Sequence, residues 1–232
     1  MEKFLRLIFP EKCIFCGQFG DVFCVMCLKK CRVLMESYCI VCDGISPGGF
    51  THEKCLKLQT KHEKLPSKLV SLFSYEGLVR DCIKRAKFSG REFLAFKRLA
   101  QFGCTFAVNL GLDFKNFVAV PIPVSSNRKK ERGFNQSEII TKVLCGNFKI
   151  KMDASVLTRT RDTLHQTSYD RNSRFQNVAN AFKVNKKVSG IKIVLVDDIC
   201  TTGATFLEAS KTVLNAGAKD VICFALSKKL KV

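Results

Sequence analysis

IVLVDDICTTGATFLEA, residues 193–209, joins a run of apolar residues to two aspartates, a threonine-rich loop and a helix-like segment. The apolar run begins at Ile191 and is rich in β-branched residues, which is typical of a central strand buried on both faces of a parallel sheet. Ligands of open α/β sheets bind beyond the carboxyl ends of such strands. This stretch therefore predicts both a fold class and the position of a binding site.

The loop after the aspartates is suited to a phosphate group. Hydroxyl groups, a glycine that lets the backbone approach closely, and the N–H groups of a helix start together form an anion site. In the loop 199–205, the hydroxyls belong to Thr201, Thr202 and Thr205, and the glycine is Gly203. Asp197 and Asp198 cannot bind the same anion, but they can accept hydrogen bonds from a diol or face a divalent metal. A ligand with a terminal phosphate and ribose hydroxyls fits both halves. The alternative is a strand–helix turn capped by threonine or aspartate.

Strands and helices alternate over most of the remaining chain. The patterns predict strands over 69–75, 117–123, 191–199 and 220–226, and helices over 78–88, 91–110, 135–145 and 204–217. Such alternation implies right-handed βαβ units, and hence an α/β fold with a mostly parallel sheet flanked by helices. Residues 60–68 are charged and contain a proline, which predicts an exposed connection.

The composition favours anionic partners. Lys and Arg exceed Asp and Glu by 19, which suits phosphate-bearing ligands, nucleic acid or an anionic membrane surface without choosing among them. The apolar stripe in MEKFLRLIFP is too short for a secretion signal, and no run approaches the ~20 apolar residues of a membrane span. We therefore expect a cytoplasmic protein, in which clustered cysteines indicate metal binding before disulfides.

Eight of the thirteen cysteines precede residue 56. This imbalance divides the chain into a cysteine-rich zinc-binding module over residues 1–60 and a larger α/β domain over residues 61–232. The module offers two sets of four zinc ligands, Cys13, Cys16, Cys24 and Cys27, followed by Cys39, Cys42, His52 and Cys55. Buried structural cysteines are the alternative, but packing does not require pairs at two-residue gaps. A module of this size would take much of its stability from metal.

Two further segments concentrate positive charge. The loop after the strand at 117–123 contains Arg128, Lys129, Lys130 and Arg132, and the segment 157–182 contains Arg159, Arg161, Arg171 and Arg174. Cations beyond a strand end suit pyrophosphate or a nucleic-acid backbone, whereas the alternative is a solvated run of charges. The second segment has few apolar anchors before Val178, so we expect an excursion from the fold that closes over a charged sugar.

VDDICTTGAT resembles the phosphoribosyl pyrophosphate (PRPP) motif of type I phosphoribosyltransferases, in which an apolar run precedes two acidic residues and T-T/S-G-x-T. The resemblance implies the type I phosphoribosyltransferase fold for residues 61–232. It also implies that Asp197 and Asp198 contact the ribose 2′ and 3′ hydroxyls. The 5′-phosphate would be held by the loop residues Cys200, Thr201, Thr202, Gly203, Ala204 and Thr205. In that family, Mg²⁺ assists the replacement of pyrophosphate at C1 of the sugar by a nucleophile.

Further motifs resemble the ComF family of competence-associated proteins. They are VPIP at 120–123, RGFNQ at 132–136, LTRTRDTLHQ at 157–166 and RFQN at 174–177. His52 departs from the CxxC pair that the family usually has at the end of the second ligand set, although histidine is a competent zinc ligand. The resemblance implies a cytoplasmic role in DNA uptake during natural transformation, with single-stranded DNA and other transformation proteins as partners.

Three functions are compatible with these patterns. The first is a competence protein that binds single-stranded DNA and PRPP. The second is an active Mg-dependent phosphoribosyltransferase with an unknown acceptor, which does not exclude the first. The third is a non-enzymatic, zinc-dependent interaction protein of the DNA-uptake machinery. No catalytic acid or base can be named, because no Ser-His-Asp or Cys-His arrangement stands out in the sequence.

Overall fold

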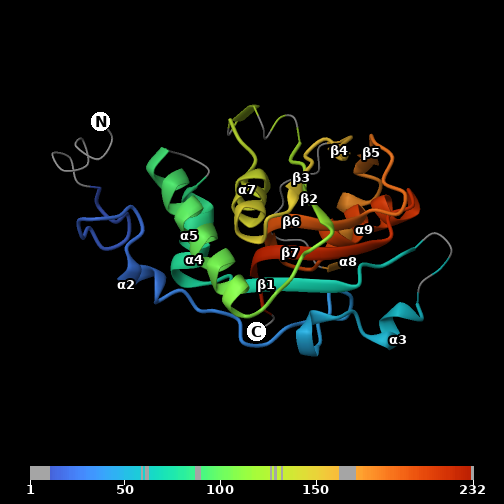
Figure 1. Ribbon diagram of the computed structural model, residues 1–232, viewed down its shortest axis with the longest axis horizontal. Coiled ribbons are helices and arrows are strands. Elements are labelled where there is room, and N and C mark those ends of the chain that lie inside the picture. Colours follow the sequence, from blue (N-terminus) through green and yellow to red (C-terminus); the bar gives the residue numbers. More distant parts are fainter. Residues whose placement is uncertain are drawn as a thin grey trace.

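The computed structural model describes residues 11–58, 60, 63–86, 90–125, 127, 130–131, 133–161 and 171–230, without the side chains of 90–91 and 171–174. Within these residues, five parallel strands form one sheet in the order β1-β7-β6-β2-β3 (Figure 1). The strands are β1 (Lys68–Ser74), β2 (Phe117–Pro121), β3 (Lys151–Met152), β6 (Lys192–Cys200) and β7 (Asp220–Lys228). The prediction of an α/β fold with a mostly parallel sheet is confirmed.

Helices cover both faces of the sheet. On one face lie α4 (Gly77–Arg85), α5 (Gly90–Asn109) and α7 (Gln136–Phe148), and on the other lies α9 (Ala204–Asn215). Val194 and Val196 of β6 pack on the first side, whereas Ile193 and Leu195 pack on the second. The central strand is thus buried on both faces, as its continuous apolar run predicts.

The shortest strands were not predicted. These are β3 and an antiparallel ribbon of β4 (Leu157–Arg159) and β5 (Phe182–Val184), which lies beside α9 together with α8 (Arg171–Val178). The ends of the expected excursion over 157–182 are therefore regular secondary structure. The middle of that segment, 162–170, lies outside the described residues. Strands of two or three residues are too short to show a periodic pattern.

The cysteine-rich residues run along the outer edge of β1. The helices described in this segment are short: α2 (Val25–Leu28), η1 (Pro47–Gly49) and α3 (Glu53–Leu56). Val33 forms an antiparallel bridge to Phe73, and Phe50 forms one to Lys68. Figure 1 shows α2 and α3 near opposite ends of this edge. The segment thereby covers backbone groups of β1 that an open edge would expose to other chains.

Both apolar cores include residues of the cysteine-rich segment. Phe23 and Leu28 are buried with α4 and α5, whereas Ile40 is buried with residues of α9 on the opposite face. The boundary near residue 60 remains a prediction from the sequence.

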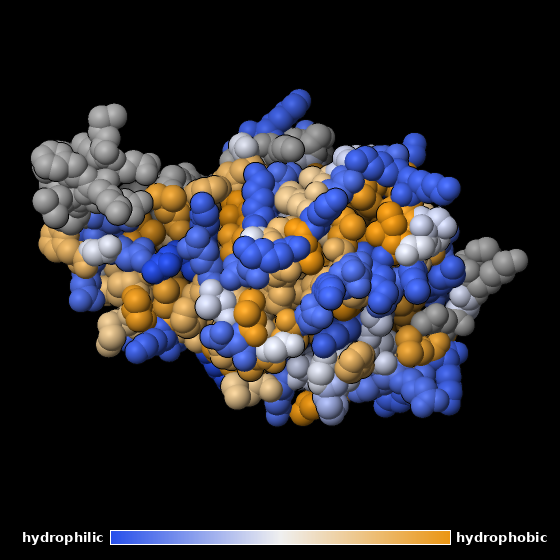
Figure 2. Space-filling model, viewed as in Figure 1, coloured by the Kyte–Doolittle hydropathy of each residue, from blue (hydrophilic) through white to orange (hydrophobic). Residues whose placement is uncertain are grey.

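On the face that Figure 2 shows, hydrophilic side chains are interspersed with apolar patches. In the described part of the chain, no helix has both the length and the apolar character that crossing a bilayer requires.

Candidate functional site

The acidic pair and the threonine-rich loop lie together at the carboxyl end of β6. Asp197 and Asp198 are half-buried near the end of this strand, and α9 begins at Ala204, after a loop of three residues. Gly203 has a φ of 80°, in the left-handed region that favours glycine. Thr201 and Thr202 are half-buried. The sequence-predicted residues therefore lie together in the place where α/β sheets bind ligands, although Cys200, Gly203 and Ala204 are buried.

The start of α9 is not a conventional threonine or aspartate cap. Its N-cap residue is Gly203, which has no side chain to accept a hydrogen bond. Thr202 Oγ1 accepts from the Ala204 N–H only at a donor–acceptor distance of 3.5 Å, which is long for a hydrogen bond. These observations disfavour the alternative in which the loop serves only as a helix cap.

The start of α7 fixes the orientation of Asp197. Ser137 Oγ donates a hydrogen bond of 2.7 Å to Asp197 Oδ1, and the Asp198 N–H donates one of 2.9 Å to the same oxygen. Asn135 caps the helix by accepting from the Ser137 N–H, and its Nδ2 donates to the Ile122 carbonyl oxygen after β2. The RGFNQ segment thus ties β2 and α7 to the acidic end of β6.

The electrostatics of the acidic pair are unusual. Burial, and next the negative charge of Asp198, raise the pKa of Asp197 to about 8, although the Ser137 hydrogen bond acts in the opposite direction. Burial and the charge of Asp198 also raise the pKa of Tyr75, a half-buried residue directly after β1. The site therefore combines a proton-holding carboxyl group, a neighbouring carboxylate and a neutral phenol.

Ser137 and Tyr75 are the site residues that sequence reasoning missed. Ser137 directly follows the RGFNQ motif, and Tyr75 is the last residue of the strand predicted over 69–75. These positions were the available signal. They did not show that the two side chains lie near the acidic pair.

The first basic loop leads directly into the site. Arg128, Lys129 and Arg132 lie outside the described residues, whereas Lys130 is described and exposed. The loop follows β2, where the Ile122 N–H donates to the Val196 carbonyl oxygen, and it ends at the α7 start that contacts Asp197. Both ends of this loop are consequently anchored beside the acidic pair.

In the second basic segment, the described arginine side chains make contacts within the protein. A guanidinium nitrogen of Arg161 donates to three carbonyl oxygens around the end of α8, and the shortest of these bonds is 2.6 Å, to Ala179. The guanidinium of Arg159 lies 5.5 Å from the ring centroid of Phe182. These contacts stabilise the helix end and the ribbon, while the side chains of Arg171 and Arg174 lie outside the described ones. A role for this segment in binding an anionic ligand therefore stays a prediction from the sequence.

Among the described residues, two clusters could each hold a zinc ion. The first cluster comprises Cys13, Cys16, Cys24 and Cys27, and the second cluster comprises Cys39, Cys42, His52 and Cys55. In each, the ligand atoms all lie within 4.8 Å of one another. The Sγ–Sγ distances of 3.6 Å for Cys16–Cys24 and 3.9 Å for Cys39–Cys55 fit the edge of about 3.8 Å that a tetrahedral ZnS₄ centre requires.

His52 suits the role of a zinc ligand. Its Nδ1 lies 3.2 Å from Cys42 Sγ, inside the cluster, while its Nε2 lies 3.1 Å from the Ile45 carbonyl oxygen. A carbonyl oxygen can only accept a hydrogen bond, so this contact assigns the ring N–H to Nε2 and leaves the lone pair of Nδ1 available for metal.

The cysteine thiols of the two clusters differ in pKa, and hence in how readily they ionise to bind metal. Burial alone would raise the pKa of Cys13, but backbone N–H groups around its sulfur outweigh that effect and lower the pKa to about 6. The same opposition lowers the pKa of Cys39. Burial instead raises the pKa of Cys55 to about 11. Each cluster thus holds one thiol that ionises readily, which is the form that binds zinc.

Comparison with known proteins identifies the family. Competence protein ComFC of Streptococcus pneumoniae strain R6 is 32% identical over 228 residues, covering 93% of this chain and 99% of that protein. The chain belongs to the ComF family. Another ComF relative, DNA utilization protein YhgH of Escherichia coli K12, is 30% identical over 233 residues, with 97% and 100% coverage. Competence protein ComFC of Bacillus subtilis is 27% identical over 88% of this chain and 82% of the relative.

The phosphoribosyl transferase domain family matches residues 136–231 of this ComF protein. The match begins at the α7 start and includes the acidic pair, the loop after β6 and α9. It confirms the predicted phosphoribosyltransferase fold, and the clusters before it could form the zinc-binding module expected of a ComF protein.

Proposed function

We propose that this ComF protein binds PRPP at the loop after β6 and single-stranded DNA along the adjoining basic loops, as a cytoplasmic protein of natural transformation. The observation that supports PRPP most is the placement of Asp197 and Asp198 directly before the phosphate-type loop at the carboxyl end of β6. The names of the relatives, competence protein and DNA utilization protein, support the wider role.

In this proposal, the loop from Cys200 to Thr205 binds the 5′-phosphate through its hydroxyls and the N–H groups at the start of α9. The acidic pair accepts hydrogen bonds from the ribose hydroxyls, and Ser137 holds Asp197 in position for them. Mg²⁺, bound with PRPP, would neutralise charge on its pyrophosphate. Zinc in the two clusters would be structural.

An active phosphoribosyltransferase is the second candidate. It is favoured by the pKa of Asp197, since a group that titrates near pH 8 suits proton transfer at neutral pH. Activity would also require an acceptor nucleophile.

Calorimetric titration of the full-length protein with PRPP, with and without Mg²⁺, tests the proposed function. We expect saturable binding that Mg²⁺ strengthens, and absence of binding under both conditions would contradict the proposal. Pyrophosphate release in the same samples, with candidate nucleophiles added, would support the second candidate. Binding without release would support a non-catalytic PRPP site.

The basic loop provides a prediction for DNA. Replacing Arg128, Lys129 and Arg132 by alanine is expected to lower the affinity for a single-stranded oligonucleotide and to flatten its dependence on salt. The slope of log K against log salt should fall by about 0.7 for each phosphate contact that is lost. Fluorescence anisotropy at several salt concentrations measures both quantities.

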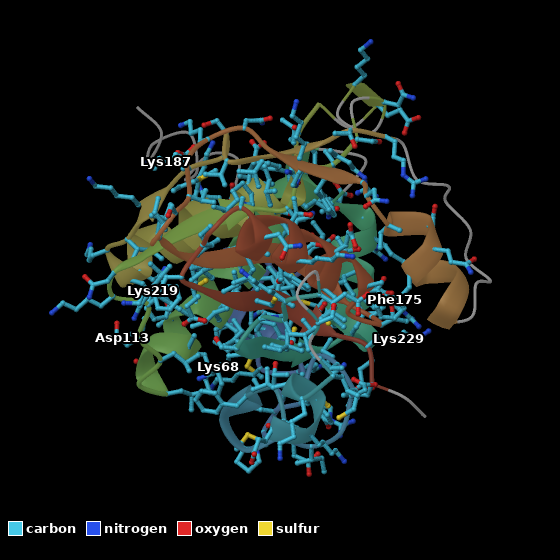
Figure 3. All side chains as sticks on the ribbon, turned by 90° about the vertical axis from the view of Figure 1, so that its right-hand side faces the viewer. Lys68, Asp113, Phe175, Lys187, Lys219 and Lys229 are labelled. Atoms are coloured by element: carbon cyan, nitrogen blue, oxygen red, sulfur yellow. The ribbon has the colours of Figure 1, made fainter. Side chains whose placement is uncertain are left out.

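A matched control removes the same charge from the opposite edge of the sheet. Lys115, Lys187 and Lys219 are exposed and precede β2, β6 and β7. Figure 3 shows Lys187 and Lys219 on the side away from Lys229, which follows β7. Their replacement by alanine is expected to change DNA binding much less. Equal losses in the two triple variants would indicate that net charge, and not the loop, determines affinity.

A further inference from the structure

A buried ion pair joins the second cluster to the strand that supports the phosphate loop. Lys228, the last residue of β7, pairs with Asp43, and the side chains are only 2% and 15% exposed. Lys228 lies opposite Cys200, the last residue of β6, in the parallel pairing of these strands. Asp43 directly follows the ligand Cys42. The pair therefore links the metal-binding turn to the base of the loop that begins at residue 200.

A second contact reaches the loop itself. Ile40, between the ligands Cys39 and Cys42, is 3% exposed and packs in the same apolar core as Cys200 and Phe206. A Cβ atom added to Gly203 would lie 3.0 Å from the Ile40 carbonyl oxygen and 3.1 Å from its Cγ1. The backbone of the metal-binding turn thus lies directly against the phosphate loop.

Neither contact is needed for zinc ligation alone or for phosphate binding alone. A buried ion pair contributes little net stability, but it imposes one relative position on the segments that it joins, since a shift would leave a charge buried without its partner. The turn from Cys39 to Asp43 is closed by hydrogen bonds of 2.9 Å from the Asp43 N–H to the Cys39 carbonyl oxygen and from the Cys39 N–H to the Gly44 carbonyl oxygen. A zinc ion held by the Cys39 and Cys42 thiols would fix the position of this turn further. The shape of the phosphate loop thus depends on the turn behind it.

We propose that Asp43 and Lys228 are positioning residues that couple the second cluster to the phosphate loop, so that zinc binding and phosphate-ester binding strengthen each other. This inference depends on the proposed function, because it takes PRPP as the ligand of the loop. Coupling of this kind is reciprocal: if zinc favours the ligand-binding shape of the loop, then PRPP must favour retention of zinc by the same factor.

The test measures zinc retention in the full-length zinc-bound protein, with and without PRPP and Mg²⁺. A zinc-selective chelator is titrated, and a brief pulse of N-ethylmaleimide, read by peptide mass spectrometry, reports which cysteines have lost metal. We expect PRPP to raise the chelator concentration that removes half of the zinc from the second cluster by about 5- to 150-fold. The concentration that removes half of the zinc from the first cluster should not change. If PRPP binds by calorimetry but the second cluster does not shift, this inference is overturned and the proposed function stands. If PRPP does not bind at all, both are overturned.

Two double variants test whether the coupling requires the Asp43–Lys228 ion pair. Asp43→Asn with Lys228→Met removes both charges of the buried pair and is expected to lose the PRPP-dependent shift. The control, Asp21→Asn with Arg98→Met, removes the 2.8 Å ion pair that joins the first cluster's segment to α5, and it should retain the full shift. A full shift in the Asp43/Lys228 variant would refute the positioning role. If that variant fails to fold, the wild-type titration still decides whether the coupling exists.

Discussion

Replacement of Asp197 by asparagine together with Asp198 by alanine is expected to weaken PRPP binding by at least ~10-fold. In the proposed complex, the Asp198 carboxylate accepts a hydrogen bond from a ribose hydroxyl, and a hydrogen bond to a charged group contributes about 1.5–3 kcal/mol, whereas one to the neutral Asp197 contributes about 0.5–1.5 kcal/mol. Loss of the Asp198 bond alone corresponds to roughly 10- to 150-fold in affinity, and a weaker bond at position 197 adds to this loss. Calorimetry with PRPP and Mg²⁺ measures the loss directly.

The matched control makes the same chemical changes at the opposite edge of the sheet. Asp113, which precedes β2, and Asp220, the first residue of β7, lie at the amino ends of parallel strands. Asp113→Asn with Asp220→Ala is expected to bind PRPP like the wild type. If the Asp197/Asp198 variant kept wild-type affinity, the acidic pair would have no part in ligand binding.

The single change Asp197→Asn also predicts a pH-dependent gain in stability. Because the folded pKa of about 8 lies above the ordinary value of 3.8, the folded protein holds a proton that the unfolded chain releases between these limits. The wild type is therefore expected to lose stability as pH rises from about 4 to about 8, whereas the amide does not titrate. Chemical denaturation at a series of pH values should show an advantage of the variant that grows over this window and then levels off. An advantage independent of pH would contradict the assigned shift.

Removal of zinc is expected to have the largest effect on folding. Structural zinc sites in small peptides contribute about 10–16 kcal/mol of apparent binding free energy, whereas whole domains are stable by only about 5–15 kcal/mol. The cysteine-rich segment contributes residues to both cores and covers the edge of β1. We therefore expect a zinc-selective chelator to lower the melting temperature strongly and to cause aggregation through the uncovered strand.

Two cysteine variants separate metal loss from a general effect of mutation. Cys42 is a half-buried member of the second cluster, and Cys145 is a half-buried cysteine outside both clusters. Cys42→Ser is expected to reduce the zinc content from two ions per chain to one, as measured by elemental analysis, while Cys145→Ser keeps two. An unchanged zinc content in Cys42→Ser would show that the second cluster does not hold the metal.

Long, strongly patterned segments could be predicted from the sequence, whereas contacts between distant segments could not. The apolar run of β6 predicted that this strand is buried on both faces. The two-residue gaps between the cysteines predicted which residues lie together in each cluster. The ribbon of β4 and β5 escaped prediction because three residues carry no periodicity. The Asp43–Lys228 pair joins positions 185 residues apart, and no local pattern identifies such a partner.

The strand order has a consequence for biosynthesis. The neighbour of β1 within the sheet is β7, and the intervening strands occupy positions farther from this edge. On the ribosome, β1 and the cysteine-rich segment emerge early, but the hydrogen-bonding partner of β1 is translated only after β2, β3 and β6. A nascent chain halted before residue 220 would therefore expose an apolar strand with one side unpaired, and chaperone binding to such stalled chains should persist until β7 leaves the exit tunnel.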